Sequence, residues 1–209
     1  MANAVTFFTA LAMALGAQCA GAQEWPTRTI RLVSPFAPGG GSDTVARAVA
    51  ERLNEQLPQQ VIVENRGGAG GLIGSAVVAN APPDGYTYVV SSIATHVIAP
   101  LTSKTDGYDP IRNFTHVALA GGPPTVIVVH PSLGPKSYAE LLKLLKARTE
   151  PLPYVSPGPG TIGHLIAEHW AEQEGFKLSH VPYKGAGQAM SDLVAGHVPL
   201  GSITWTAAI

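Results

Sequence analysis

Two glycine-rich segments have the residue types and the placement needed to bind a small anion. Residues 35–43 read PFAPGGGSD and residues 156–161 read SPGPGT, and each lies between an apolar run and an amphipathic one. A helix start offers unpaired backbone N–H groups and a partial positive charge, and glycines let an anion approach the backbone closely. Two such helix ends across a cleft would suit a dicarboxylate. Either loop alone is equally consistent with an ordinary helix cap.

A nucleotide-dependent oxidoreductase is the alternative that the glycine spacing leaves open. Residues 158–163 (GPGTIG) match the spacing of a dinucleotide-binding motif between a strand and a helix. That motif needs an acidic residue at the end of the next strand, where residues 181–184 read VPYK. Residues 35–43 lack the Gly-Lys-Ser/Thr of a P-loop. We therefore expect no enzyme and no cofactor.

The histidines and basic residues give weaker indications. His164 and His169 are five positions apart, about 140° around a helix, so they do not share a face as zinc ligands would. We expect no metal site. His164 flanks the second loop and is either a ligand donor or a surface histidine. Arg47, Arg66 and Lys184 could neutralise ligand charge, although solvated surface charge is the simpler interpretation of each.

Composition limits the class of protein. The 209 residues suffice for two small domains, and 45% of them are hydrophobic, enough to bury a core. The 13 Lys and Arg nearly balance the 14 Asp and Glu, and no basic block indicates binding to nucleic acid.

The N-terminus predicts export. Residues 5–17 are apolar and uncharged, too short to span a bilayer, and Ala20-Gly21-Ala22 fits a signal-peptidase site. We expect residues 1–22 to be a signal peptide cleaved after Ala22, which makes the mature protein periplasmic. A buried N-terminal helix is the alternative. Cys19, the single cysteine, would be removed, and the residues before it do not fit a lipoprotein site.

The rest of the sequence alternates short apolar runs with amphipathic stretches, which is typical of an α/β fold. We expect two lobes, residues 23–112 and 113–209, and Ser42 or Asp43 as the cap of the first helix. The expected strands are residues 29–34, 61–63, 86–91, 115–120, 125–130, 152–156, 178–183 and 198–205. The expected helices begin near residue 42, cover residues 72–80, follow a capping box at Ser137 and Glu140, and cover residues 161–174 and 187–195.

The order of these motifs resembles the Bug-type extracytoplasmic solute receptors of tripartite tricarboxylate transporters. The first lobe contributes Trp25-Pro26, Ile30-Arg31-Leu32-Val33, residues 35–40 (PFAPGG), Asp43, Ala46-Arg47, residues 63–71 (VENRGGAGG) and residues 83–87 (PDGYT). The second lobe contributes residues 154–158 (YVSPG), Gly160, His164-Leu165, Glu168, residues 180–185 (HVPYKG), Asp192-Leu193 and Gly196. The resemblance covers nearly the whole chain after residue 22.

The resemblance implies a two-lobe, flytrap-like periplasmic binding protein of type II that is monomeric when complete. Its ligand would be a di- or tricarboxylate, an acidic amino acid or an aromatic acid, and its partners the permease subunits of the transporter. By motif, the contacts implied are Phe36, Ala37, Gly39, Gly40, Ser42, Asp43, Ser91, Thr95, His96, Ser156, Gly158, Thr161 and His164. Asp43 would order the loop rather than touch an anion, which it repels.

Members of this family continue beyond the position where this sequence stops, and the further segment returns to the first lobe. We therefore expect a first lobe that lacks this segment, with three strands and exposed apolar surface, and further apolar surface near Trp205. A carboxylate sensor with a signalling partner remains an alternative to transport.

Overall fold

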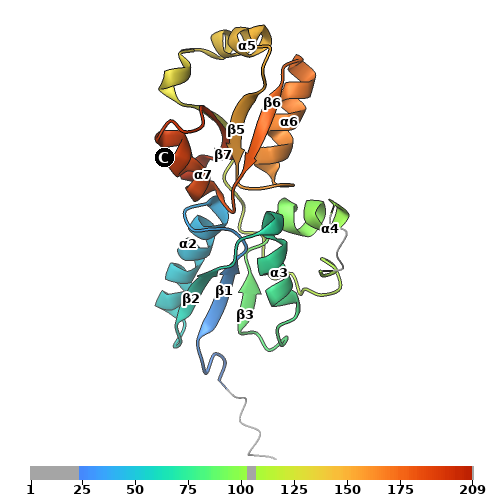
Figure 1. The fold of residues 1–209 in the computed structure, drawn as a ribbon. Helices are drawn as coiled ribbons and strands as arrows, with labels where there is room; N and C mark the ends of the chain where they lie inside the picture. The colour runs from blue at the N-terminus through green and yellow to red at the C-terminus, as the bar shows by residue number, and fades with distance from the viewer. Residues whose placement is uncertain (1–23, 103–106, 209) are drawn as a thin grey trace, which may run out of the picture.

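Two separate sheets form the framework of the chain (Figure 1). The computed structural model describes residues 24–102 and 107–208, so the expected signal peptide and Cys19 lie outside the described residues. The first sheet has the order β2-β1-β3 and the second β4-β7-β5-β6. The α/β expectation is thus confirmed. In the part of the chain that the structure describes, no helix is long and apolar enough to cross a membrane.

The first lobe is a parallel sheet flanked by helices. Apolar side chains of the first two strands, such as Ile30 and Val61, pack against the α2 face that carries Ala50. The α3 helix packs near the other side of the sheet, as Figure 1 shows. The elements are β1 (Ile30–Ser34), α2 (Gly41–Gln56), β2 (Val61–Asn65), η2 (Ala69–Gly71), α3 (Leu72–Ala79), β3 (Thr87–Val89), a π-helical turn η3 (Ala94–Ile98) and α4 (Ala99–Thr102).

The second lobe buries its sheet on both faces. Tyr154 belongs to the core under α5 and α6, whereas the next residue, Val155, belongs to the core under α7. This alternation follows from the two-residue period of a strand. The elements are β4 (Thr125–Val129), η4 (Pro131–Leu133), α5 (Tyr138–Ala147), β5 (Leu152–Ser156), α6 (Ile162–Glu174), β6 (Leu178–Pro182), α7 (Ala186–Val194), β7 (Leu200–Thr204) and α8 (Trp205–Ala208).

Local sequence signals explain several helix starts. The Ser137 hydroxyl accepts the Glu140 N–H at 3.2 Å, and the Glu140 carboxylate accepts the Lys136 N–H at 2.8 Å, close to the predicted capping box. Thr161 caps α6 in the same way by accepting the His164 N–H. Both helices therefore begin one residue after their capping hydroxyl.

Two expectations were wrong. Residues 115–120 form no strand: Val117 is 73% and Leu119 96% exposed, and β propensity alone does not hold a strand that has no neighbour to pair with. The α2 helix begins at Gly41 with Gly40 as its cap, so Ser42 and Asp43 lie in its first turn instead of capping it. Asp43 still accepts a backbone N–H of the loop, that of Gly39, although it lies in the first turn of the helix and not at the cap.

The expected apolar surface is present on the first lobe and near Trp205, which is 49% exposed. On the first lobe the exposed apolar side chains include Ile73, Ile93 and Leu101. The expected strand over residues 198–205 is present as β7, which lies inside the second sheet. β7 pairs with both β4 and β5, and its first four residues are buried.

The close packing of α6 on β7 leads to a prediction about Gly163. A Cβ there would lie 2.3 Å from the Ser202 carbonyl oxygen. We expect Gly163→Ala to lower the free energy of unfolding by about 1–3 kcal/mol, the cost of overpacking, although helix propensity alone favours alanine. Urea denaturation measures this. Gly122→Ala, which adds a carbon with nothing within 4 Å, is the control. Equal stability of the two variants would contradict the packing.

Candidate ligand-binding site

The loop before α2 is held in place by Asp43. Its Oδ2 accepts the Gly39 N–H at 3.0 Å and Arg47 Nε at 3.0 Å, and its Oδ1 accepts Asn65 Nδ2 at 2.9 Å. The same Asn65 amide donates to the Phe36 carbonyl at 3.1 Å. The Asp43 carboxylate therefore orders the loop, the role that we expected for it, and its oxygens are already engaged by protein donors.

The pKa of Asp43 reflects these contacts. Burial raises the pKa of this carboxyl, but hydrogen bonds from Arg47, Gly39 and Asn65, together with the Arg47 charge, outweigh burial and leave the pKa below its usual value. The carboxylate is therefore ionised at neutral pH and stabilises the folded loop in that form.

The remaining polar side chain of the first loop is also engaged. Ser42 Oγ accepts from Ser34 Oγ at 3.1 Å and donates to the Val90 carbonyl at 3.3 Å. These bonds connect the first turn of α2 to the ends of β1 and β3. Ala37 and Gly40 are buried, while Gly39 is exposed and Phe36 is half-buried.

The two lobes meet backbone to backbone at this loop. The Ala37 N–H donates to the Lys184 carbonyl at 2.9 Å, across the lobe interface. A Cβ at Gly185 would lie 2.8 Å from the Ala37 nitrogen, and a Cβ at Gly67 would lie 2.9 Å from the Lys184 oxygen. A Cβ at Gly187 would lie 2.3 Å from the Pro38 oxygen. Only residues without side chains allow this approach.

The second-lobe candidates converge on the loop before α6. Ser156 Oγ accepts the Gly158 N–H at 3.1 Å, and Thr161 Oγ1 donates to the Gly158 carbonyl at 2.7 Å. The Gly160 N–H donates to His164 Nδ1 at 3.2 Å. Ser156, Gly158 and Thr161 are buried, and His164 is half-buried. The two hydroxyls thus shape the loop, whereas the His164 ring is the more accessible group.

The structure pairs the glycine loops differently from the arrangement that the sequence suggested. The loop before α2 lies against the start of α7, since a Cβ at Gly40 would lie 3.6 Å from the Ala186 nitrogen. The loop before α6 instead lies against the first lobe near Gly70, whose Cβ would be 2.6 Å from the Pro159 oxygen. A Cβ at Gly160 would contact Ile98. The starts of α2 and α6 do not oppose each other directly.

The candidates after β3 are divided between the loops and a separate aromatic group. Thr95 is fully buried, and its methyl group approaches Gly71 beside the Phe36 ring. Its hydroxyl closes the turn by accepting the Ser92 N–H at 2.9 Å. Ser91 is exposed. Thr95 therefore joins the loop cluster.

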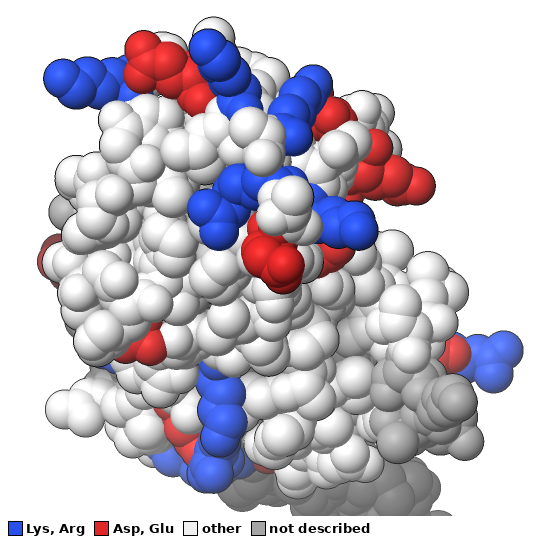
Figure 2. Space-filling model, turned by 45° about the horizontal axis from the view of Figure 1, so that its top comes forward, with Lys and Arg blue, Asp and Glu red and all other residues white. Residues whose placement is uncertain are grey.

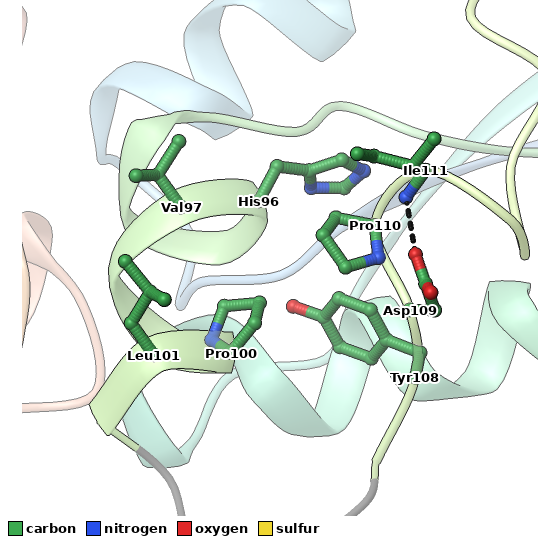
Figure 3. A pocket seen from close by; sticks show the side chains of 8 residues that line it. All are labelled: His96, Val97, Pro100, Leu101, Tyr108, Asp109, Pro110 and Ile111. Atoms are coloured by element: carbon green, nitrogen blue, oxygen red, sulfur yellow. Dashed lines mark hydrogen bonds between the residues drawn. The ribbon is translucent and has the colours of Figure 1, made fainter.

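His96 lies in an aromatic group of the first lobe. Its ring is 4.6 Å from Phe114, 6.0 Å from Tyr108 and 5.8 Å from His116. Burial, and then the His116 charge, lower the pKa of His96. An open hollow of about 440 Å³ lies beside it and is lined by His96, Val97, Pro100, Leu101, Tyr108, Asp109, Pro110 and Ile111 (Figure 3). His96 Nδ1 also lies 3.1 Å from Thr95 Oγ1, so His96 adjoins the loop cluster through Thr95.

The two arginines among the basic candidates contact acidic partners. Arg47 contacts Asp43, and Arg66 forms an ion pair with Glu64, which also accepts from Arg31. The Lys184 side chain is exposed. On the face shown in Figure 2, basic and acidic side chains lie side by side and leave a broad uncharged area between them. Among residues 24–102 and 107–208, no cluster of His, Cys, Asp and Glu is arranged to hold a metal ion.

Packing also accounts for the glycine spacing of residues 158–163. A Cβ at Gly158 would lie 2.8 Å from the Tyr183 oxygen, and Gly163 has the contact with Ser202 described above. Gly158 and Gly160 have φ values of 139° and 69°, a region that favours glycine. These positions require glycine without any nucleotide.

Several interface residues were absent from the sequence-based candidates. His180 contacts Ser156 Oγ through Nε2 at 2.6 Å, and Asn65 supports two groups of the first loop. Lys184 was a candidate for its charge, but its backbone carbonyl accepts the cross-lobe hydrogen bond. Both segments, residues 63–71 and 180–185, were part of the motif series quoted above. Their glycines were the available signal for a close approach of two backbones.

Comparison with known proteins assigns the family. The model described as the tripartite tricarboxylate transporter family receptor matches residues 45–209. The chain belongs to this family. An Agrobacterium vitis relative, encoded in the ttuE-ttuC' intergenic region of TAR-I, is 40% identical over 177 residues, 85% of this chain and 51% of the relative. BugT of Bordetella pertussis is 35% identical over 178 residues, 85% of this chain and 55% of BugT.

Solved structures of receptors agree with the fold. An R. palustris protein with adipate matches with a TM-score of 0.85 and 36% identity, over 88% of this chain and 62% of that one. MatC from Rhodopseudomonas palustris, with bound malate, matches with a TM-score of 0.79 and 32% identity, over 88% and 63%. The two-lobe periplasmic binding protein fold and the Bug-type resemblance are thus confirmed. The chain spans about half the length of the curated relatives described here.

The Asp43 network predicts a pH-dependent loss of stability. Because its pKa is lowered on folding, the contribution of Asp43 is fully present above the unfolded value of about 3.9 and is lost as the pH falls through the folded pKa. We expect Asp43→Asn to cost about 1–3 kcal/mol at pH 7 and progressively less as the pH falls below about 3.9, measured by urea denaturation. Glu51→Gln, on the exposed side of the same helix, is the control. A difference that is constant with pH would contradict the network.

The backbone contact between the lobes makes a second prediction. Gly185→Ala should separate the loops and break the Ala37–Lys184 hydrogen bond at a cost of about 1–3 kcal/mol. Amide hydrogen exchange at Ala37 should then accelerate by roughly tenfold or more, while amides of β5 stay protected. The control is Gln188→Ala, at an exposed position of α7. Unchanged protection at Ala37 would mean that the bond does not hold the lobes together.

Proposed function

We propose that the chain is a periplasmic solute-binding receptor that holds a small carboxylate between its lobes and presents it to the permease subunits of a tripartite tricarboxylate transporter. The observation that carries the proposal is the convergence of loops from both lobes on one interface. Strand-to-helix loops of the first lobe meet the loops before α6 and α7 through glycines. Two further related structures, titled a periplasmic transporter and the periplasmic binding protein BugD, support a periplasmic location.

The chemistry of the interface favours an anion recognised by neutral donors. The described arginines near the loops, Arg47 and Arg66, are paired with Asp43 and Glu64, and Glu64 also pairs with Arg31. Helix starts and an imidazole N–H are then the groups suited to bind a carboxylate, since backbone N–H groups and the helix dipole favour negative charge. His164 lies in the first turn of α6, where both contributions act on the same ligand group.

A short dicarboxylate is the ligand class that we propose. The titles of two related structures name adipate and malate, which are both aliphatic dicarboxylates. A ligand with one carboxylate at each end can be held by helix starts of the two lobes at once. Binding of this kind stabilises the closed arrangement because both lobes contribute donors. A sensor that reports to a signalling partner would share this binding step.

Ligand-dependent stabilisation tests the proposal. Adipate, malate and succinate should raise the melting temperature of the protein, since a ligand at a hundred times its Kd adds about 2.7 kcal/mol, whereas NAD and ATP should not. His164→Ala should weaken binding by roughly tenfold or more, the effect of losing one hydrogen bond to a charged group. The matched control is His169→Ala, at an exposed position of the same helix.

The alternatives predict other results in the same assay. Stabilisation by NAD but not by any acid would show that the protein binds a nucleotide and is not a carboxylate receptor. If the His164 and His169 variants lose affinity equally, His164 has no special role in the site, although the proposal of carboxylate binding still holds.

A further inference from the structure

Three aromatic rings from three elements form a column beside the loop before α6. Tyr154 of β5 stacks on His180 of β6 with 5.0 Å between ring centroids and 25° between planes. His180 stacks in turn on His164 of α6, at 4.2 Å and 23°. Tyr154 is fully buried and the two histidines are half-buried. His180 is thus fixed between a buried ring and the most accessible ring of the loop.

The edge of the His180 ring contacts the loop as well. Its Nε2 lies 2.6 Å from Ser156 Oγ, the hydroxyl that accepts the Gly158 N–H. Thr161 closes the other side of the loop by donating to the Gly158 carbonyl. One imidazole therefore acts on both ends of the loop, on Ser156 by a hydrogen bond and on His164 by stacking.

The hydrogen bonds determine which His164 nitrogen is free to donate. Nδ1 accepts the Gly160 N–H, so the proton of the neutral ring is on Nε2. The Nε2–H is consequently a donor whose direction depends on the plane of the ring. That plane is set by the Gly160 hydrogen bond on one side and by the His180 ring beneath.

We propose that His180 is a positioning residue of the ligand site: it anchors Ser156 and supports the His164 ring, so that the His164 Nε2–H and the loop keep one orientation toward a bound carboxylate. This role rests on the function proposed above. His180 does not touch the ligand in this scheme. It acts by limiting the orientations of two groups that otherwise rotate, which lowers the entropy lost on binding.

The surroundings of His180 keep it neutral for this role. The groups that face it are Tyr154 and Ser156 from β5 and His164 and Glu168 from α6. Burial, and then the His164 charge, lower the pKa of His180 to about 4, while Glu168 opposes the shift. Glu168 accepts a hydrogen bond from Tyr154 Oη at 2.7 Å. The His180 ring is therefore neutral at physiological pH and carries no charge into the stacked column.

The test separates the two contacts of His180. His180→Phe retains a stacking ring without the hydrogen bond, His180→Gln retains a polar group near Ser156 without the ring, and His180→Ala retains neither. Calorimetry with adipate and malate should show the largest loss, about tenfold or more, for the alanine variant and smaller losses for the other two. His169→Ala is the control. Melting temperatures record any effect on folding separately.

A spectroscopic readout distinguishes positioning from stability. Long-range ¹H–¹⁵N spectra of the imidazoles should show His164 as the Nε2–H tautomer in the wild type. In His180→Ala the unsupported ring should turn away from the Gly160 N–H that fixes this tautomer, and a mixture of tautomers should appear. If the alanine variant melts earlier but keeps its affinity and its tautomer, His180 has only a structural role and the proposal is wrong. If the wild type binds none of the acids, the proposed function fails, and the tautomer alone decides whether His180 orients His164.

Discussion

Contact between two backbones without intervening side chains is the constraint on which the lobe interface depends. The Ala37–Lys184 hydrogen bond is possible because Gly67 and Gly185 place no Cβ between the two loop backbones that form it. This requirement also determines how the first loop is ordered. Asp43 accepts the Gly39 N–H, and Asn65 donates to the Phe36 carbonyl and to Asp43, so both side chains hold the backbone of the loop. Glycines that look like a ligand cradle in the sequence thus also serve lobe closure.

A second consequence concerns charge. Asp43 and Glu64 pair with Arg47 and Arg66 beside the loops, and the loops themselves present backbone N–H groups and the His164 imidazole. Neutral donors bind an anion without the large desolvation cost of a buried ion pair. They also hold an anion less tightly than a bidentate arginine would.

The sequence predicted the elements better than their contacts. Residues 152–156 and the capping box at Ser137 were predicted correctly because local patterns determine them. Residues 115–120 have the same apolar character but form no strand, since a strand depends on a neighbour that local sequence does not reveal. The loop partners and His180 were missed for the same reason: the Ser156–His180 contact joins two strands that meet only after folding. The resemblance to a family identified the fold from motif order, but it did not supply these contacts.

The order of the second sheet affects how that lobe is made. β4 pairs only with β7 in this sheet, and β7 also pairs with β5, so Thr125 meets Thr204 across almost the whole of the lobe. Contacts between such distant positions require a long loop to close before they stabilise anything, which slows folding. Until β7 arrives, β4 and β5 have no shared neighbour and the lobe stays incomplete. A chain with this strand order cannot complete the second sheet until β7 has been made, so the strands before it wait for a partner from far along the chain.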